Sequence, residues 1–253
     1  IFQIIWARHC FTVLLALPIL FFFFKSNFVW TEKPKLQLIR GLLLLGTNIC
    51  FYYAVSHISL SKALTLTFIS PLVVTVFSSI FLSEKVGIKR WSAVVIGFTG
   101  AIVVIRPGYI PLDMGSLAAL SAGTMYAFYL ITTRKLSISD NSMLTLLITG
   151  LIGSFVMSFT IPFVWVSPTL DQWLLLSLIG VVTLVGHFLL ILSFKYAEAS
   201  KLAPISYFEV VTNTIYGYFL FSHFPDNWTL VGLVIIISSG LFVFYRERKL
   251  GIV

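Results

Sequence analysis

The run from Trp173 to Ser193 reads WLLLSLIGVVTLVGHFLLILS and contains no charged side chain. A helix needs about 20 mainly apolar residues to cross the roughly 30 Å hydrocarbon core of a bilayer. The run is too long for a strand and lacks the alternation of a membrane β-strand. Because backbone groups in lipid must hydrogen-bond within the chain, the run predicts a transmembrane α-helix.

Similar apolar stretches recur along the whole chain. Hydrophobic residues make up 58% of the 253 residues and charged residues only 10%, against about 25% charged in a soluble domain. The fold class predicted is therefore all-α, a polytopic transmembrane helical bundle without an intervening soluble domain. Its nine predicted spans are roughly residues 3–24, 36–56, 64–82, 91–106, 115–133, 143–165, 173–193, 203–222 and 228–245.

The basic residues fall on alternate connections between these spans. One set of connections carries fourteen of them: Lys25, Lys33, Lys35, Arg40, Lys85, Lys89, Arg90, Arg134, Lys135, Lys195, Lys201, Arg246, Arg248 and Lys249. The other set carries only Lys62 and Arg106. This asymmetry predicts a cytoplasmic C-terminus in a bacterial inner membrane. It also explains the formal net charge of +8 without nucleic acid as a partner.

An internal repeat is visible in two segments that align without a gap. LSKALTLTFISPLVVTVFSSIFLSE starts at Leu60, and ASKLAPISYFEVVTNTIYGYFLFSH starts 139 residues later at Ala199. We therefore predict a first repeat over 1–108 and a second over 109–253. The counterpart of the helix near Gly115 would precede the visible chain, so nine helices of a ten-helix, 5+5 inverted-repeat transporter fold are expected.

Two charged residues lie well inside predicted spans, Arg8 and Glu209. An intramembrane charge costs about 2.5–3.5 kcal/mol on insertion scales and usually lines a transport pathway. Asn213 and Tyr216 share a helical face with Glu209. We expect Arg8 and Glu209 to face each other across the bundle; the alternative is an ion pair that only fixes helix packing.

Weaker polar pairs follow the same helical spacing. Asn48 lies four residues before Tyr52, Tyr126 three before Tyr129, and Thr183 four before His187. Each pair could instead serve packing. The candidate substrate-binding residues are thus Arg8, Asn48, Tyr52, Tyr126, Tyr129, His187, Glu209, Asn213 and Tyr216. Arg8 would meet a substrate carboxylate, and Glu209 would meet an amine or exchange a coupling proton.

Motifs of other protein classes are absent from the sequence. It contains no GxxxxGK[ST] phosphate loop, no HExxH and no GxSxG, so neither ATP hydrolysis nor a known catalytic constellation is predicted. Cys10 and Cys50 lie in apolar runs without metal-ligand spacing. We predict no enzyme activity, cofactor or metal site; an intramembrane enzyme and a non-transporting scaffold are the alternatives of another class.

Three segments carry a family resemblance. They are SPLVVTVFSSIFLSEKVGIKRWSAVVIGFTGAIVVIRPG from Ser70, KLAPISYFEVV from Lys201, and FSHFPDNWTLVGLVIIISSGLFVFYRE from Phe221. They resemble the EamA type of the drug/metabolite transporter superfamily. The last segment, together with the arginine of IIWARHCF, resembles a subgroup of S-adenosylmethionine uptake transporters.

The resemblance implies ten helices, a central cavity between two repeats, and alternating access. The implied function is secondary transport of small polar or zwitterionic organic metabolites, amino-acid-like or cofactor-like, with S-adenosylmethionine as one such substrate. Export of amino acids or drug-like metabolites is the alternative within the superfamily. A coupling proton is also implied, whereas monomer and homodimer both stay open.

Overall fold

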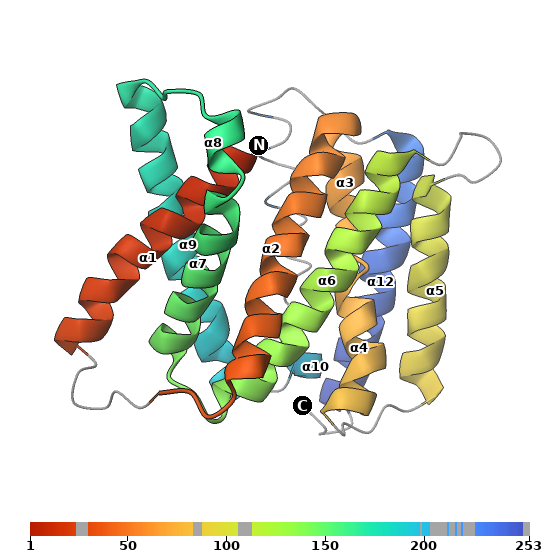
Figure 1. Cartoon of the computed structure of the whole chain (residues 1–253). Coiled ribbons are helices and arrows are strands. Elements are labelled where there is room, and N and C mark those ends of the chain that lie inside the picture. The colour runs from red at the N-terminus through yellow and green to blue at the C-terminus, as the bar shows by residue number, and fades with distance from the viewer. Residues whose placement is uncertain are drawn as a thin grey trace. The chain divides into compact units, whose positions relative to one another are not determined.

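The computed structural model describes residues 1–23, 30–82, 88–105, 113–197, 199–202, 212, 216, 219 and 226–249, and every regular element in these ranges is a helix (Figure 1). The all-α prediction is thereby confirmed. The helices are α1 (Phe2–Phe23), α2 (Pro34–His57), α3 (Leu60–Thr67), α4 (Ser70–Phe81), α5 (Ile88–Ile105), α6 (Met114–Ser137), α7 (Ser142–Ser158), α8 (Ile161–Val164), α9 (Leu170–Tyr196), α10 (Ala199–Leu202) and α12 (Asn227–Lys249).

Helix α9 contains the apolar run that begins at Trp173, and local signals extend it at both ends. The Thr169 hydroxyl accepts a hydrogen bond from the backbone N–H of Gln172, and the Gln172 side chain accepts one from the Thr169 N–H. This reciprocal capping box satisfies two of the backbone donors that a helix start leaves open. The helix therefore begins at Leu170, three residues before the predicted span.

The third predicted span, 64–82, corresponds to the apolar stretch Leu60–Phe81, which consists of two helices. Pro71 lies in the first turn of α4, where it has no N–H to donate to the carbonyl of Thr67 and its ring would clash with that carbonyl. Helix α3 consequently ends at Thr67, and Phe68 and Ile69 form a turn. The sixth predicted span, 143–165, divides in the same way, with α7 ending at Ser158 before the proline-containing α8.

Among the residues that the structure describes, five helical segments are long and apolar enough to cross a bilayer: Phe2–Phe22, Pro34–His57, Leu60–Phe81, Met114–Ser137 and Leu170–Tyr196. Three shorter helices, Trp91–Val104, Ser142–Ser158 and Asn227–Phe242, are also apolar. Large apolar side chains lie exposed on these helices, Leu14 at 64% and Val182 at 63% for example, as expected where lipid is the solvent. The eighth predicted span, 203–222, falls almost wholly outside the described residues.

The helices form two compact units. Unit 1 contains Ile1–Ile49 and Thr132–Ala197; unit 2 contains Cys50–Ile131 and Glu198–Val253. This spatial division differs from the predicted repeat boundary at 108/109, which stays a prediction. The starts of α3 and α10 are 139 residues apart, as are those of α5 and α12, the same offset as between the aligned segments.

In unit 1, α1 packs against α7 and α9 (Figure 1). Glycines make this approach close: a Cβ atom on Gly180 of α9 would lie 2.3 Å from the Cβ of Phe11, and one on Gly150 of α7 would lie 2.8 Å from a methyl of Val13. Small residues at such crossings allow helices to approach closely within a membrane. Helix α1 is thus held from two sides.

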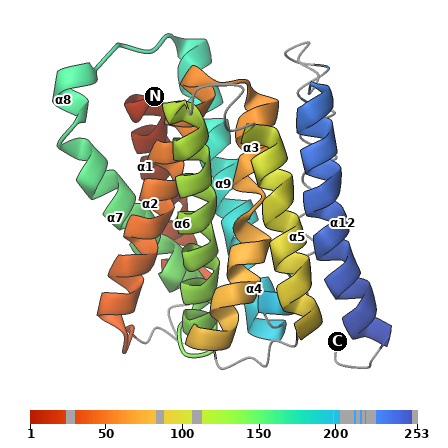
Figure 2. The same cartoon turned by 90° about the vertical axis from the view of Figure 1, so that its right-hand side faces the viewer.

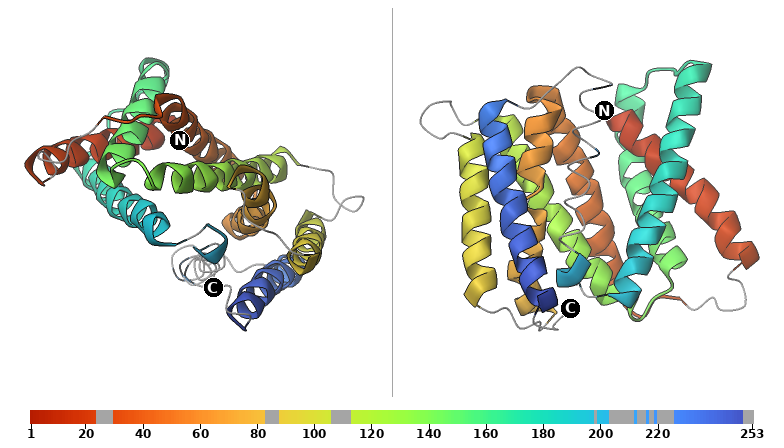
Figure 3. Two further views of the ribbon diagram at one scale, coloured as in Figure 1. Left: turned by 90° about the horizontal axis from the view of Figure 1, so that it is seen from below. Right: turned by 180° about the vertical axis from the view of Figure 1, so that it is seen from behind.

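In unit 2, α12 runs beside α5 (Figures 2 and 3). The two backbones meet where a Cβ atom on Gly232 would lie 2.6 Å from the carbonyl oxygen of Gly100, and one on Gly100 would lie 2.8 Å from the Gly232 oxygen. Any larger residue at either position would have to separate the helices. This crossing joins segments from the two predicted repeats.

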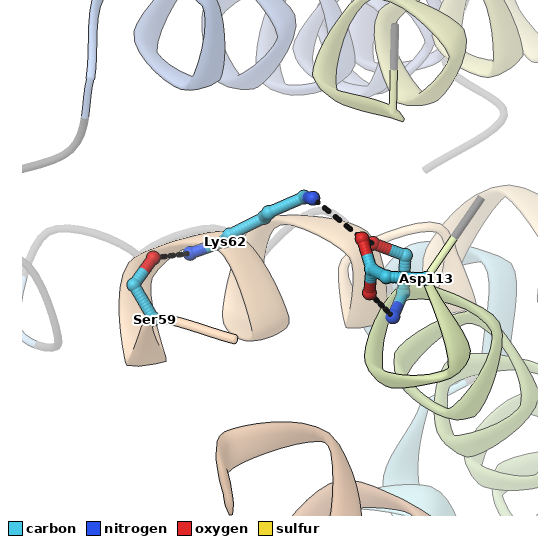
Figure 4. A network of polar contacts seen from close by, with 4 residues as sticks. Ser59, Lys62 and Asp113 are labelled. Carbon is cyan, nitrogen blue, oxygen red and sulfur yellow. Dashed lines mark hydrogen bonds and ion pairs between the residues drawn. The ribbon is translucent and has the colours of Figure 1, made fainter. Parts of the chain in front are cut away.

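An ion pair links the start of α3 to the start of α6 within unit 2 (Figure 4). Lys62 Nζ lies 3.0 Å from Asp113 Oδ2, and Asp113 also accepts hydrogen bonds from the backbone N–H and hydroxyl of Ser116. Burial alone would raise the pKa of Asp113, but the bonds from Lys62 and Ser116 outweigh it and lower that pKa below its usual value. The carboxylate therefore serves both as helix cap and as ion-pair partner.

Candidate functional site

Arg8 is the seventh of the 22 residues of α1 and contacts two of the residues predicted to accompany it. Its Nη1 donates to Asn48 Oδ1 of α2 at 3.0 Å, and its Nη2 lies 2.9 Å from His187 Nε2 of α9. All three residues belong to unit 1. The sequence analysis proposed each residue separately, and the structure brings them together from three helices.

The donor and acceptor inventory determines the protonation state of this group. A guanidinium has only donors, so His187 Nε2 must accept and the neutral ring must carry its proton on Nδ1. For the same reason Asn48 presents its carbonyl oxygen to Arg8. The amide nitrogen of Asn48 then lies 3.5 Å from His9 Nε2, at the outer limit of a hydrogen bond, with the histidine nitrogen as the acceptor.

Arg8, His9, Asn48 and His187 together form what we call the Arg8 cluster. His9 is its most closely packed member. It is only 3% exposed, and its ring lies directly on α7, where a Cβ atom on Gly153 would come within 2.5 Å of the ring's Cγ and Nδ1. The sequence analysis did not include His9 in the site. The GxxG pair of Gly150 and Gly153 on α7 is the sequence signal that a bulky side chain from a neighbouring helix packs there.

The Arg8 cluster can bind an anion. A guanidinium fork matches a carboxylate or phosphate with two parallel charge-assisted hydrogen bonds. Asn48 and His187 are neutral acceptors, so an incoming anion can replace either without leaving a buried negative charge unpaired. The Thr12 hydroxyl donates to the Arg8 carbonyl oxygen at 2.8 Å, which ties the local backbone while leaving the guanidinium available to its partners.

A second arginine is wholly buried in unit 1 and corrects the sequence analysis, which counted it among the loop cations. Arg40 lies in the second turn of α2 and is 0% exposed. Its Nε donates to the Thr133 hydroxyl at 2.8 Å, and its Nη1 donates to the Thr145 carbonyl at 3.2 Å and to the Thr149 hydroxyl. Arg40 is thus a buried cation held by hydroxyl and carbonyl groups.

Gln37 continues this network one turn earlier on α2. Its Nε2 donates to Asp140 Oδ2 at 2.7 Å and to the Thr145 hydroxyl at 3.0 Å. The sequence signal for the network was present: Thr145 and Thr149 lie four residues apart, and Gln37 and Arg40 three apart. Two polar stripes on apolar helices predict helix pairs that hydrogen-bond each other.

The other predicted site residues that the structure describes belong to unit 2. Tyr126 and Tyr129 stack on each other within unit 2, with centroids 5.7 Å apart and planes 18° apart. Tyr52, also in unit 2, packs edge-on to Phe51. Tyr216 is 60% exposed. Glu209 and Asn213 lie outside the described residues, so the expected approach of Arg8 and Glu209 stays a prediction.

Comparison with known proteins determines the family. Residues 1–106 and 113–245 match the EamA-like transporter family. The chain belongs to this family. An EamA-like transporter is an integral membrane protein that moves small molecules rather than an enzyme, in agreement with the sequence analysis and with the apolar helices described above.

Two relatives and one solved structure illustrate the membership. The S-adenosylmethionine uptake transporter of Rickettsia felis is 31% identical over 249 residues, which are 98% of this chain and 84% of that protein. The pseudopaline exporter CntI of Pseudomonas aeruginosa is 29% identical over 213 residues, 82% of this chain and 74% of that protein. A solved structure described only as "Crystal structure of protein" superposes with a TM-score of 0.72 at 15% identity, over 98% of this chain and 88% of that one, which shows the fold alone.

Proposed function

We propose that this EamA-like transporter is a secondary carrier for small zwitterionic organic metabolites, and that Arg8 binds the substrate carboxylate. The observation that carries the proposal is the meeting of Arg8, Asn48 and His187 from three helices. An arginine in mid-span is costly to insert and is usually retained for a pathway. Its planar fork suits a carboxylate better than any other common metabolite group of single charge.

S-adenosylmethionine is the first substrate to test. The Rickettsia felis relative is named as its uptake transporter, and the molecule carries the amino-acid carboxylate that the Arg8 cluster suits. Uptake would proceed by alternating access in a bacterial inner membrane with the C-terminus in the cytoplasm. The substrate roles predicted for Tyr52, Tyr126, Tyr129, Glu209, Asn213 and Tyr216 form part of the same proposal.

The experiment compares two ligands that differ only in the carboxylate. Purified protein in proteoliposomes is assayed with labelled S-adenosylmethionine and with decarboxylated S-adenosylmethionine. Wild-type protein is expected to prefer the carboxylated ligand by about 10- to 100-fold, the value of one or two charge-assisted hydrogen bonds. Arg8→Ala is expected to abolish this preference.

The matched control is Leu14→Ala, which lies on the same helix with a 64% exposed side chain and should transport like wild type. If Arg8→Ala retains the full preference for the carboxylated ligand at normal expression, Arg8 does not bind the carboxylate. If wild-type vesicles accumulate neither this ligand nor any member of a panel of zwitterionic metabolites, the proposed function is wrong.

Export is the second candidate function, because the Pseudomonas aeruginosa relative is named as an exporter. The same carboxylate site would serve either direction, since the gradients across the membrane set the direction of net transport by a carrier. Flux measured in right-side-out and inside-out membrane vesicles separates the two. Accumulation in right-side-out vesicles supports uptake, and accumulation in inside-out vesicles alone supports export.

A further inference from the structure

The contact between Arg8 and His187 contains an acceptor whose role can change. His187 Nε2 lies 2.9 Å from Arg8 Nη2, and its lone pair is used by that donor. A neutral imidazole can exchange such a hydrogen bond for a proton, whereas a hydroxyl or amide acceptor cannot do so near neutral pH. The chemistry of His187 therefore depends on whether Arg8 is donating to it.

The charged and titratable groups around His187 come from each of its neighbouring helices. Helix α1 contributes Arg8 and His9, and α2 contributes Arg40. Helix α7 has no titratable side chain, and on α9 itself Asp171 and Lys195 lie in the first and last turns. Arg8, Arg40 and His9 all disfavour a positive charge on the ring, and a ligand carboxylate arriving at Arg8 would change the local charge in the direction that favours an imidazolium.

We propose that His187 takes up a proton when a substrate carboxylate binds Arg8, so that the carrier binds carboxylate and proton together. This inference rests on the proposed function and adds its coupling group. The carboxylate accepts the N–H of Arg8 Nη2 that His187 held, the freed Nε2 lone pair takes a proton from water, and the new N–H can donate to the carboxylate. Release of substrate reverses each step and returns the proton.

His187 rather than His9 is the group suited to this exchange. The His9 ring is 3% exposed and packs against Gly153, where an added Cβ atom would come within 2.5 Å of it. His187 is half-buried and bonds directly to Arg8. It is therefore the less confined of the two rings and the one in contact with the guanidinium.

The test measures protons directly. Purified protein in weakly buffered detergent solution is titrated with S-adenosylmethionine while a pH-indicator dye reports proton uptake. Wild-type protein is expected to take up about one proton per bound ligand, and its affinity should rise by up to about tenfold for each unit that the pH falls. Decarboxylated S-adenosylmethionine, at saturating concentration, is expected to bind without proton uptake.

Variants then assign the proton to a residue. His187→Gln can still accept from Arg8 through its amide oxygen but cannot take a proton, so it should bind ligand with no proton uptake and a flat pH dependence. His57→Gln removes an exposed histidine at the end of α2 and should behave like wild type. Glu209→Gln should bind ligand more weakly, because Glu209 belongs to the proposed substrate site, but at saturating ligand it should still take up about one proton per bound ligand, because the coupling is assigned to the imidazole.

Several results would overturn the coupling while leaving the proposed function intact. They are ligand binding that needs Arg8 but takes up no proton, equal proton uptake with the decarboxylated ligand, or undiminished uptake in His187→Gln. Loss of uptake in Glu209→Gln alone would move the coupling to that carboxyl group and also refute the inference. Failure of the proposed function shows itself differently, as ligand binding that does not respond to Arg8→Ala. Should His187→Gln not fold, the two-ligand comparison on wild-type protein decides by itself.

Discussion

Two arginines of unit 1, Arg40 and Arg8, are held in different ways. Arg40 is 0% exposed and donates to the hydroxyls of Thr133 and Thr149 and to a backbone carbonyl. Arg8 is half-buried and donates to an amide and to an imidazole. The partners of Arg40 are hydroxyls and a carbonyl, which do not exchange protons near neutral pH, whereas the partners of Arg8 include an imidazole, which can accept a proton.

The difference shows that burial of a charge does not by itself identify a transport site. The guanidinium of Arg40 is wholly buried, so a ligand that displaced its hydroxyl and carbonyl acceptors would leave donors of a buried charge unsatisfied. Neutral partners that can rearrange allow an anion to enter. We therefore expect Arg40 to stabilise the fold and Arg8 to serve substrate binding, and the following predictions can break or sharpen that contrast.

The largest effect is expected from Arg40→Ala. Removing the guanidinium takes away the hydrogen bonds that join α2 to Thr133 on α6 and to Thr145 and Thr149 on α7, which should cost on the order of 3 kcal/mol of unfolding free energy. For a protein of this size, that is a lowering of Tm by on the order of 10 °C. Thermal unfolding in detergent, followed by tryptophan fluorescence, measures it.

Arg8→Ala is the matched variant, since it removes the same side chain from the same unit. It should lower Tm by far less than Arg40→Ala while losing the preference for a carboxylated ligand. Equal destabilisation by the two substitutions, or loss of ligand preference in Arg40→Ala at full stability, would erase the contrast between a structural and a functional arginine.

An intermediate effect is expected from Gly153→Ala. The new methyl group would come within 2.5 Å of the buried His9 ring, and such overpacking costs about 1–3 kcal/mol. The displaced ring should also disturb Asn48 and weaken ligand binding at Arg8. Both Tm and ligand affinity are measured.

Gly186→Ala provides the control because it adds the same methyl group to a helix facing open space. It should be neutral or stabilising by about 0.5–1 kcal/mol, the usual gain of alanine over glycine in a helix. If Gly153→Ala unfolds no more easily than Gly186→Ala, the packing of His9 on α7 is not as close as described.

The smallest effect is expected from Asp113→Asn in unit 2. Its loss of stability shows how much less a more exposed charge contributes than the buried Arg40 does. The ion pair with Lys62 should contribute at most about 1 kcal/mol, since 34% of the Asp113 side chain is exposed. Because folding lowers the pKa of Asp113, its contribution is present above the unfolded pKa of about 3.9 and is lost as pH falls through the folded value.

Thermal unfolding of wild type and Asp113→Asn at several pH values checks the sign of this effect. The difference in Tm should be present at pH 7 and should shrink on acidification. Lys62→Met together with Asp113→Asn completes a double-mutant cycle. A coupling free energy between Lys62 and Asp113 as large as the loss of unfolding free energy in Arg40→Ala would contradict this ranking. It would show that the exposure of a charged side chain does not indicate its contribution to stability in this protein.

Much of the helical architecture was predictable because the chemistry of the bilayer requires it. Lipid demands long apolar runs with internal hydrogen bonds, so the predicted span 36–56 lies within α2 and 228–245 within α12. Apolar content could not show where the helix within an apolar stretch is interrupted. The division into α3 and α4 depends on the hydrogen bond and steric clash of Pro71, which hydropathy does not measure.

The candidate site was predictable residue by residue but not as an arrangement. Helical spacing relates residues on one helix, so it could nominate Arg8, Asn48 and His187 but not their contact across three helices. Arg40 was assigned to a loop because basic residues near span ends usually lie there. Its burial depends on hydroxyls of α6 and α7, a tertiary fact that only packing reveals.

The glycine crossing of α5 and α12 has a consequence for how the protein is made. Helix α5 leaves the ribosome long before α12, and at about 5–20 residues per second the wait is on the order of ten seconds. During that time the Gly100 face of α5 lacks the partner that α12 later supplies at Gly232. A holding factor at the translocon, or transient cover by lipid, would therefore have to protect this surface, and stalling synthesis just before Asn227 should expose it to quality-control proteases.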